Sequence, residues 1–189
     1  MRKKTCAAFI FEGFADHQLS LVLAGLNRTE TVVLETFSVR GRPVVSASGL
    51  RVTPHASLDS MEPEDFDILL LPGGARWEKG DNLEIFPLLR AVAGRQPLIA
   101  VGEAVLGLAD LGLLDDIPHT GICPDHIQKY CPDYAGASFF RRQACVGAGG
   151  IVTLDAQSLL GHGILGLFDT LQKIYANTHA FFDHEQQTT

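Results

Sequence analysis

The stretch Asp67-Ile68-Leu69-Leu70-Leu71-Pro72-Gly73-Gly74 indicates the fold class of this chain. A short, unbroken apolar run of this kind is typical of a strand that is buried on both faces, as in a parallel sheet. The proline and the two glycines then end the strand. Further runs that are apolar or rich in β-branched residues predict similar strands at residues 6–11, 31–38, 97–101 and 151–154.

Helical patterns separate these strands along the chain. Apolar residues recur at helical spacing after Asp16, which is the expected N-cap, at Leu19, Val22, Leu23 and Leu26. Further helices are expected at residues 82–93, with Asn82 as the cap, and at residues 103–114, 124–130, 158–175 and 176–182. Strands that alternate with helices predict an α/β fold: a doubly wound, mostly parallel sheet with helices on both faces, which is a flavodoxin-like three-layer sandwich.

Two regions depart from this alternation. Residues 43–45 and 51–53 flank Ser48-Gly49, which predicts a hairpin. Residues 138–140 and 144–146 are predicted as short strands before the strand at residues 151–154. Because no segment is long or polar enough to mark a linker, we expect residues 1–189 to form a single domain.

The composition excludes several classes of function. The 189 residues are 46% hydrophobic and 20% charged, which is normal for a globular protein. A net charge of −7 at pH 7 disfavours binding to nucleic acid. No apolar run approaches the roughly 18 residues that a membrane span needs, and residues 6–11 are too short for the apolar core of a signal peptide. We therefore expect a cytoplasmic protein without membrane or nucleic-acid partners.

The cysteines are expected to be reduced and unpaired. They are Cys6, Cys123, Cys131 and Cys145, and no two have C-x-x-C spacing. Cys123 and Cys131 lie near His119 and His126 in the sequence, but their spacing matches no common zinc-ligand pattern. The sequence therefore predicts neither a metal nor a cofactor.

The functional site is expected where the strands end, because ligands in parallel α/β sheets bind at the carboxyl ends of the strands. The relevant segments are residues 11–18, 71–74 and 101–103. Val101-Gly102-Glu103 is predicted to be a sharp strand-to-helix turn, and hydrolases use such an elbow to hold a nucleophile.

Three collinear motifs resemble the ThiJ/PfpI superfamily, which has a class I glutamine amidotransferase-like fold. Residues 66–74 resemble its D-x-L-x-L-P-G-G strand and loop. Residues 100–114, followed by His119-Thr120, resemble its A-x-C-x-x-x-x-x-L-A-x-x-G-L-L segment and the later H-T pair. Gly13-Phe14-Ala15-Asp16-His17-Gln18 resembles the G-F-A-D-W-E segment of its amidotransferase-like branch. The resemblance extends over about residues 5–172.

The departures from this pattern concern the reactive positions. The resemblance implies that the family's cysteine falls on Gly102 and that its partner glutamate falls on Gln18. A histidine that many members carry near the cysteine falls near Gly121. Glycine has no nucleophile, and a glutamine side chain cannot accept a proton near neutral pH. The resemblance therefore implies a site that has lost its cysteine chemistry.

A binding site is expected to remain at this elbow. The backbone amides of Gly73, Gly74 and Glu103 resemble the family's oxyanion hole, and such amides attract small anions. The predicted ligand-binding residues are Gln18, Gly73, Gly74, Gly102, Glu103, His119 and Thr120. Glu103 and Gln18 also have plain structural interpretations, as a helix first-turn acid and as a partner of the backbone. His17 is expected at the surface or at a dimer contact, and Trp77 is expected to pack near the rim of the site.

We therefore predict a non-catalytic, regulatory or binding member of this superfamily that takes a small carboxylate or carbonyl ligand and, as the resemblance implies, forms a homodimer. The alternative is a hydrolase, amidase or glyoxalase-like enzyme whose reactive group has moved to Cys123 or Glu103. A third alternative is a sensor module, because some relatives join this fold to a DNA-binding domain. No such domain is expected in this chain.

Overall fold

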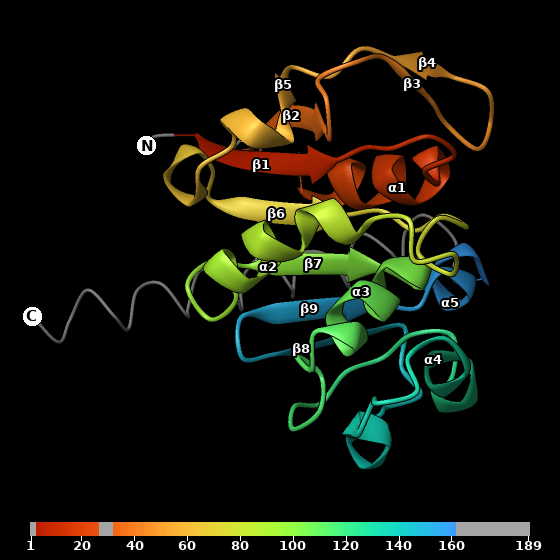
Figure 1. The fold of residues 1–189 in the computed structure, drawn as a ribbon. Helices are drawn as coiled ribbons and strands as arrows, with labels where there is room; N and C mark the ends of the chain where they lie inside the picture. Colours follow the sequence, from red (N-terminus) through yellow and green to blue (C-terminus); the bar gives the residue numbers. More distant parts are fainter. Residues whose placement is uncertain (1–2, 27–31, 162–189) are drawn as a thin grey trace, which may run out of the picture.

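The computed structural model describes residues 3–26 and 32–161. Its main sheet has the strand order β5-β2-β1-β6-β7-β9-β8 (Figure 1). The strands are β1 (Lys4–Phe9), β2 (Val32–Ser38), β5 (Ala56–Ser57), β6 (Ile68–Leu71), β7 (Leu98–Val101), β8 (Cys145–Ala148) and β9 (Ile151–Leu154). Every neighbouring pair is parallel except β8 and β9. The predicted hairpin is also present, as β3 (Val44–Val45) paired with β4 (Arg51–Val52).

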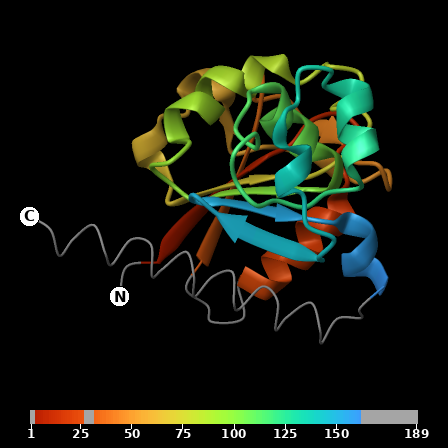
Figure 2. The same ribbon diagram turned by 90° about the horizontal axis from the view of Figure 1, so that it is seen from below.

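Helices cover both faces of the sheet (Figure 2). On one side lie α2 (Phe86–Val92), α3 (Val105–Asp110) and α4 (Pro124–Tyr130). On the other lie α1 (Asp16–Leu26) and α5 (Ala156–Gly161). Every residue of β6, β7 and β9 is buried, which explains their unbroken apolar sequences. The predicted α/β class and the mostly parallel sheet are confirmed.

Several local predictions were wrong. Residues 138–140 do not form a strand, because the chain there forms the 3-10 helix η6 (Gly136–Phe139), after which Phe140 makes a single bridge to His119. The helix predicted at residues 103–114 is shorter, since η5 (Gly102–Ala104) leads into α3 and Gly112 takes a φ of +71° soon after it. The predictions for residues 162–175 and 176–182 lie outside the described residues.

Two predicted helix caps were also wrong. Asp16 is the first residue of α1 rather than its cap, and its Oδ1 accepts a hydrogen bond from the Ser48 amide at 3.2 Å, which ties the hairpin to the helix. Asn82 precedes η4 (Leu83–Ile85), but its side chain makes no capping hydrogen bond. The helix then continues as α2. Asn82 therefore precedes the helix as expected but does not cap it with its side chain.

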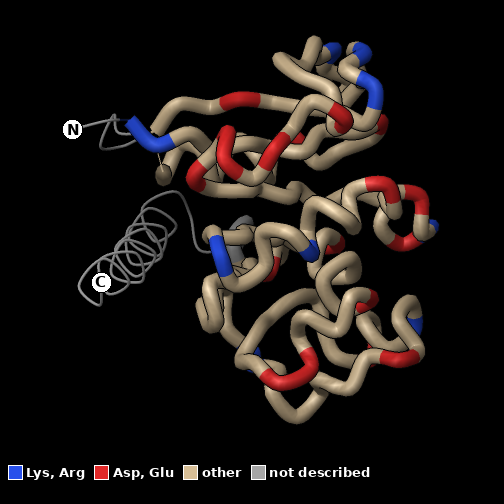
Figure 3. Tube along the Cα trace, turned by 60° about the vertical axis from the view of Figure 1, so that its left-hand side comes forward, with Lys and Arg blue, Asp and Glu red and all other residues tan. Residues whose placement is uncertain are grey.

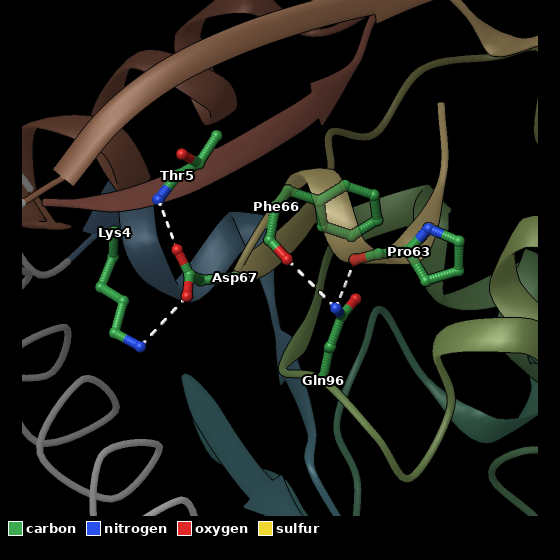
Figure 4. A network of polar contacts seen from close by, with 6 residues as sticks. All are labelled: Lys4, Thr5, Pro63, Phe66, Asp67 and Gln96. Atoms are coloured by element: carbon green, nitrogen blue, oxygen red, sulfur yellow. Dashed lines mark hydrogen bonds and ion pairs between the residues drawn. The ribbon is translucent and has the colours of Figure 1, made fainter. Parts of the chain in front are cut away.

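Polar contacts hold together the N-terminal ends of the strands, at the end of the sheet opposite to the predicted site (Figure 4). The Asp67 carboxylate accepts hydrogen bonds from the Thr5 amide at 2.9 Å and from Lys4 Nζ at 3.1 Å. Gln96 Nε2 donates to the carbonyl oxygens of Pro63 and Phe66. These contacts join β1 and β6 and hold the loop before β7. The loops at the C-terminal ends of the strands take no part in them and are left to form a site.

No helix within residues 3–26 and 32–161 is both long and apolar enough to cross a membrane.

Candidate functional site

Gly102 lies at the sharp turn where β7 ends and η5 begins, as the sequence predicts. Its φ of +56° is in the left-handed region, which favours glycine because a side chain there is strained. A Cβ atom added at Gly102 would lie 3.1 Å from Gln18 Nε2 and 3.2 Å from Ala156 Cβ. The buried elbow therefore faces a glutamine of α1 and the start of α5.

The two backbone amides that follow Pro72 point toward this elbow. The Gly73 N–H donates to Gln18 Oε1 at 2.9 Å, and this contact is buried. The Gly74 N–H donates to Glu103 Oε2 at 3.1 Å. Each amide therefore already holds an oxygen of the chain's own side chains, one neutral and one that carries the charge of a carboxylate.

The structure thus brings together Gln18, Gly73, Gly74, Gly102 and Glu103, but it does not leave the two glycine amides open. A Cβ atom at Gly73 would overlap both Glu103 Oε2 and Gln18 Oε1, which explains why a residue without a side chain fits there. The Glu103 carboxylate occupies the place where a small anion was expected.

His119 and Thr120 are held by other contacts. His119 is fully buried, and its Nδ1 lies 2.8 Å from the Ile117 carbonyl oxygen. Because a carbonyl only accepts, Nδ1 carries the proton and Nε2 accepts from the Tyr134 hydroxyl. The Thr120 N–H donates to Thr153 Oγ1 at 2.7 Å, and Thr120 Oγ1 donates to the Gln143 carbonyl at 2.7 Å. These bonds attach the segment to β9 and its neighbours, which is a supporting role.

Burial gives His119 a consequence for stability. Its pKa is lowered from 6.5, chiefly by burial and further by the positive charge of Arg141, although the Ile117 carbonyl opposes this. The His119 imidazole therefore binds a proton more readily in the unfolded chain than in the folded one. The free energy of unfolding is expected to fall as the pH drops through 6.5. Urea unfolding midpoints measured from pH 7.5 to pH 5 test this prediction.

Two variants separate His119 from the other titrating groups. His119→Gln should reduce the slope of the midpoint against pH, whereas His17→Gln should not, because His17 is exposed. An unchanged slope in His119→Gln would contradict the assignment.

Cys123 does not join the elbow. Its Sγ accepts a hydrogen bond from the His126 amide at 3.4 Å and so caps α4. The His126 imidazole lies instead beside Glu78, with Nε2 3.3 Å from Oε1. Gly121 is buried, and a Cβ there would lie 3.3 Å from Val105 Cγ1, so this position packs against α3.

The remaining thiols, of which Cys6 and Cys131 are buried and Cys145 is partly buried, are unsuited to nucleophilic chemistry. Burial raises the pKa of Cys6 and of Cys145 to about 12 and that of Cys131 to about 11. None of the cysteines is in a disulfide. The described residues contain no group of three histidine, cysteine or acidic side chains that could hold a metal ion.

Trp77 has a definite role that the sequence only suggested. Its indole N–H donates to the Pro72 carbonyl at 2.9 Å, and the ring is buried against Phe9 and Phe11. The turn after Gly74 is thereby fastened to the end of β6. The interpretation of Gln18 as a partner of the backbone is confirmed by its contact with the Gly73 amide. The contact between Glu103 and the Gly74 amide was missed, because no local pattern links two residues that are 29 positions apart in the sequence.

Comparison with known proteins identifies the family of this chain. Residues 4–159 match the model of the DJ-1/PfpI family. Two Bacillus subtilis proteins named as uncharacterized proteases, YoaZ and YdeA, are 27% and 28% identical to this chain. The matches cover 81% of this chain and 77% of YoaZ, and 95% of this chain and 93% of YdeA.

Solved structures show the same arrangement of elements. A DJ-1 superfamily protein from Agrobacterium tumefaciens is 31% identical, with a TM-score of 0.74 over 92% of this chain and 98% of that protein. A ThiJ/PfpI family protein from Bacillus anthracis is 25% identical, with a TM-score of 0.77 over 92% of this chain and 84% of that protein. From its sequence motifs, its sheet and these matches, the chain belongs to the DJ-1/PfpI family.

Proposed function

We propose that this protein is a non-catalytic member of the DJ-1/PfpI family that binds a small carboxylate or carbonyl compound at the elbow. The observation that carries the proposal is the turn at Gly102, where the chain presents bare backbone between Gln18 and Ala156. A family cysteine at this place would supply the reacting sulfur, and glycine supplies none.

The internal contacts of Gln18 and Glu103 support the non-catalytic part of this proposal. Both residues use their oxygens to satisfy the Gly73 and Gly74 amides, which a catalytic site would keep for the substrate. The Glu103 carboxylate is half-buried and marks where the carboxylate of a ligand fits. A ligand at the Gly74 amide has to displace this side chain, so its affinity reflects an exchange of one carboxylate for another.

The proposal predicts how two substitutions change ligand affinity. Glu103→Gln keeps the shape of the side chain but removes its charge, so acetate should bind about tenfold more tightly, since repulsion between nearby like charges exceeds 1 kcal/mol in a partly buried site. Gly73→Ala should abolish binding, because its Cβ would fill the space used by Glu103 and Gln18. Amide NMR shifts of Gly73, Gly74 and Glu103 in acetate and pyruvate titrations measure both effects.

Glu64→Gln is the matched control, because Glu64 is exposed on η3 (Pro63–Asp65) at the opposite edge of the sheet. It should leave the affinity unchanged. The proposal is wrong if the elbow amides do not respond to either compound in Glu103→Gln, or if the protein turns over amides, peptides or methylglyoxal well above the buffer rate.

The enzyme alternative would use Cys123 or Glu103. In that case, turnover would disappear in Cys123→Ala or in Glu103→Gln. The homodimer that the resemblance implies is proposed here as well, and sedimentation equilibrium would measure it.

A further inference from the structure

A second cavity, of about 300 Å³, opens at the carboxyl ends of β1 and β2. It is lined by the ends of these strands and by the turn and helix start that follow β6, so it lies at the ligand-binding edge of the sheet. Its volume is at the lower end of the range for small-molecule sites. Gln18, Gly102 and Glu103 are not among its lining residues, so it is separate from the elbow.

Asn82 is the most unusual residue in this lining. Only 2% of its surface is exposed, and its Nδ2 finds no hydrogen-bond partner within the described part of the chain. A buried amide group without an acceptor is destabilising, and native proteins rarely retain one. It also leaves the following helix uncapped. Asn82 therefore carries a donor group without an acceptor among the described residues, and it does so in the wall of this cavity and of a smaller neighbouring one.

Arg76 adds a second buried donor. Its Nη2 donates to the Asp81 carbonyl at 3.1 Å, which fixes the side chain, but its Nε is buried and has no partner among the described residues. Like Asn82 Nδ2, this group can only donate. Two residues of the cavity wall thus carry buried donors that lack acceptors within residues 3–26 and 32–161.

Charged residues surround the mouth of the cavity. Arg40 and Arg42 are exposed and line the cavity together with Arg76, against two acidic residues, Glu12 and Glu84. The Glu12 carboxylate already accepts a hydrogen bond from the Val45 amide at 3.0 Å. Several Lys and Arg positions of the Cα trace lie close together at the upper right of Figure 3, although the whole chain carries a net charge of −7.

We propose that this cavity binds an oxyanion, a carboxylate or a phosphate, carried on a small apolar body. The oxygens would accept from Asn82 Nδ2 and Arg76 Nε once these buried groups turn toward the cavity, with Arg40 and Arg42 at the entrance. The apolar body would lie against Phe11 and Val39, which line the other part of the cavity. The elbow takes the small compounds proposed above, and this site is additional to it.

Four probes test the chemistry by amide NMR of the full chain. Phenyl phosphate and benzoate carry both an oxyanion and an apolar body, inorganic phosphate lacks the body, and benzyl alcohol lacks the charge. At least one of the first two should shift the Asn82 side-chain NH₂ and the Val39 amide at millimolar concentration, and the other two should bind at least tenfold more weakly. Comparison of the affinities of phenyl phosphate and benzoate shows whether the site prefers a phosphate or a carboxylate.

Two variants and a control locate the site. Asn82→Leu should weaken binding about tenfold, as expected for a hydrogen bond to a charged acceptor, while the melting temperature rises because an unsatisfied buried group is removed. Arg76→Lys keeps the charge but loses the Nε donor, so it should also weaken binding. Arg95→Gln should change nothing, because Arg95 is exposed just before β7 at the opposite edge.

The proposal is overturned if no probe shifts the Asn82 NH₂ signals, or if both variants bind as tightly as the parent. Shifts confined to Gly73 and Gly74 would also overturn it, while leaving the elbow proposal intact. Conversely, a response at Asn82 without one at the elbow would support this site, and the function proposed for the elbow would still be decided by its own acetate and pyruvate titrations.

Discussion

Gly102→Cys is expected to lower the free energy of unfolding by about 2 kcal/mol, because a non-glycine residue at positive φ costs roughly 1–2 kcal/mol and tight contacts add to this. The φ of +56° and the approach of a Cβ to Gln18 and Ala156 are the two causes. Urea denaturation measures the loss. Gly13→Ala isolates the first cause, since Gly13 has a φ of +79° and no described atom lies within 4 Å of an added Cβ.

The same substitution, combined with Gln18→Glu, should create a reactive thiol. A cysteine at the start of η5 and α3 would lie at a helix N-terminus, which lowers the pKa of a thiol below its usual value of about 8.5. The rate of alkylation against pH, compared with the parent, measures this pKa. The three cysteines that burial makes unreactive contribute little background, and Cys123→Ala removes the fourth. A new thiol that titrates near 8.5 would show that the elbow is not built for a thiolate.

Gly136→Ala is expected to lower the free energy of unfolding by about 3 kcal/mol, at the upper end of the usual effect of overpacking. An added Cβ would overlap the Leu114 carbonyl oxygen and lie 2.7 Å from Tyr134 Cε2 and 3.0 Å from His119 Cε1. A backbone atom cannot turn aside as a side chain can, so the segment that carries His119 has to move. Urea denaturation again provides the measurement.

Gly147→Ala is the matched control for Gly136→Ala. Gly147 lies in β8, and its added Cβ would meet only Val152 Cγ2 at an ordinary 3.6 Å. Its free energy of unfolding should change by less than about 1 kcal/mol. Equal losses in the two variants would contradict the overlap described for Gly136.

The sheet could be predicted from the sequence because its signal is local. Each of β6, β7 and β9 is an unbroken apolar run, and burial on both faces requires such runs. The turn at Gly102 followed from the order of strand and helix and from the family resemblance. The 3-10 helix η6 was mistaken for a strand because Ser138-Phe139-Phe140 has the composition of one, whereas packing around His119 decides its conformation.

A backbone contact for Gln18 could be predicted, but which amide it holds, and that Glu103 holds the next one, could not, because both depend on distances across the fold. Gln18 reaches Gly73 from α1, and Glu103 reaches Gly74 from the turn after β7. The same holds for Asn82: the sequence indicates a helix cap, and only the packed structure shows that its Nδ2 is buried without a partner in the part of the chain that is described. Pairing across the tertiary structure, rather than local preference, sets the chemistry of both sites.

The internal satisfaction of the Gly73 and Gly74 amides affects how compounds for this protein should be screened. A compound that enters the elbow exchanges one set of hydrogen bonds for another and returns the Glu103 carboxylate to water. The compound therefore stabilises the fold only by the difference in free energy between its own contacts and those of the displaced side chain. Since stabilisation follows the net dissociation constant, the rise in melting temperature at a given concentration is small. Thermal-shift libraries would consequently overlook elbow ligands, and methods that observe the glycine amides directly are better suited to find them.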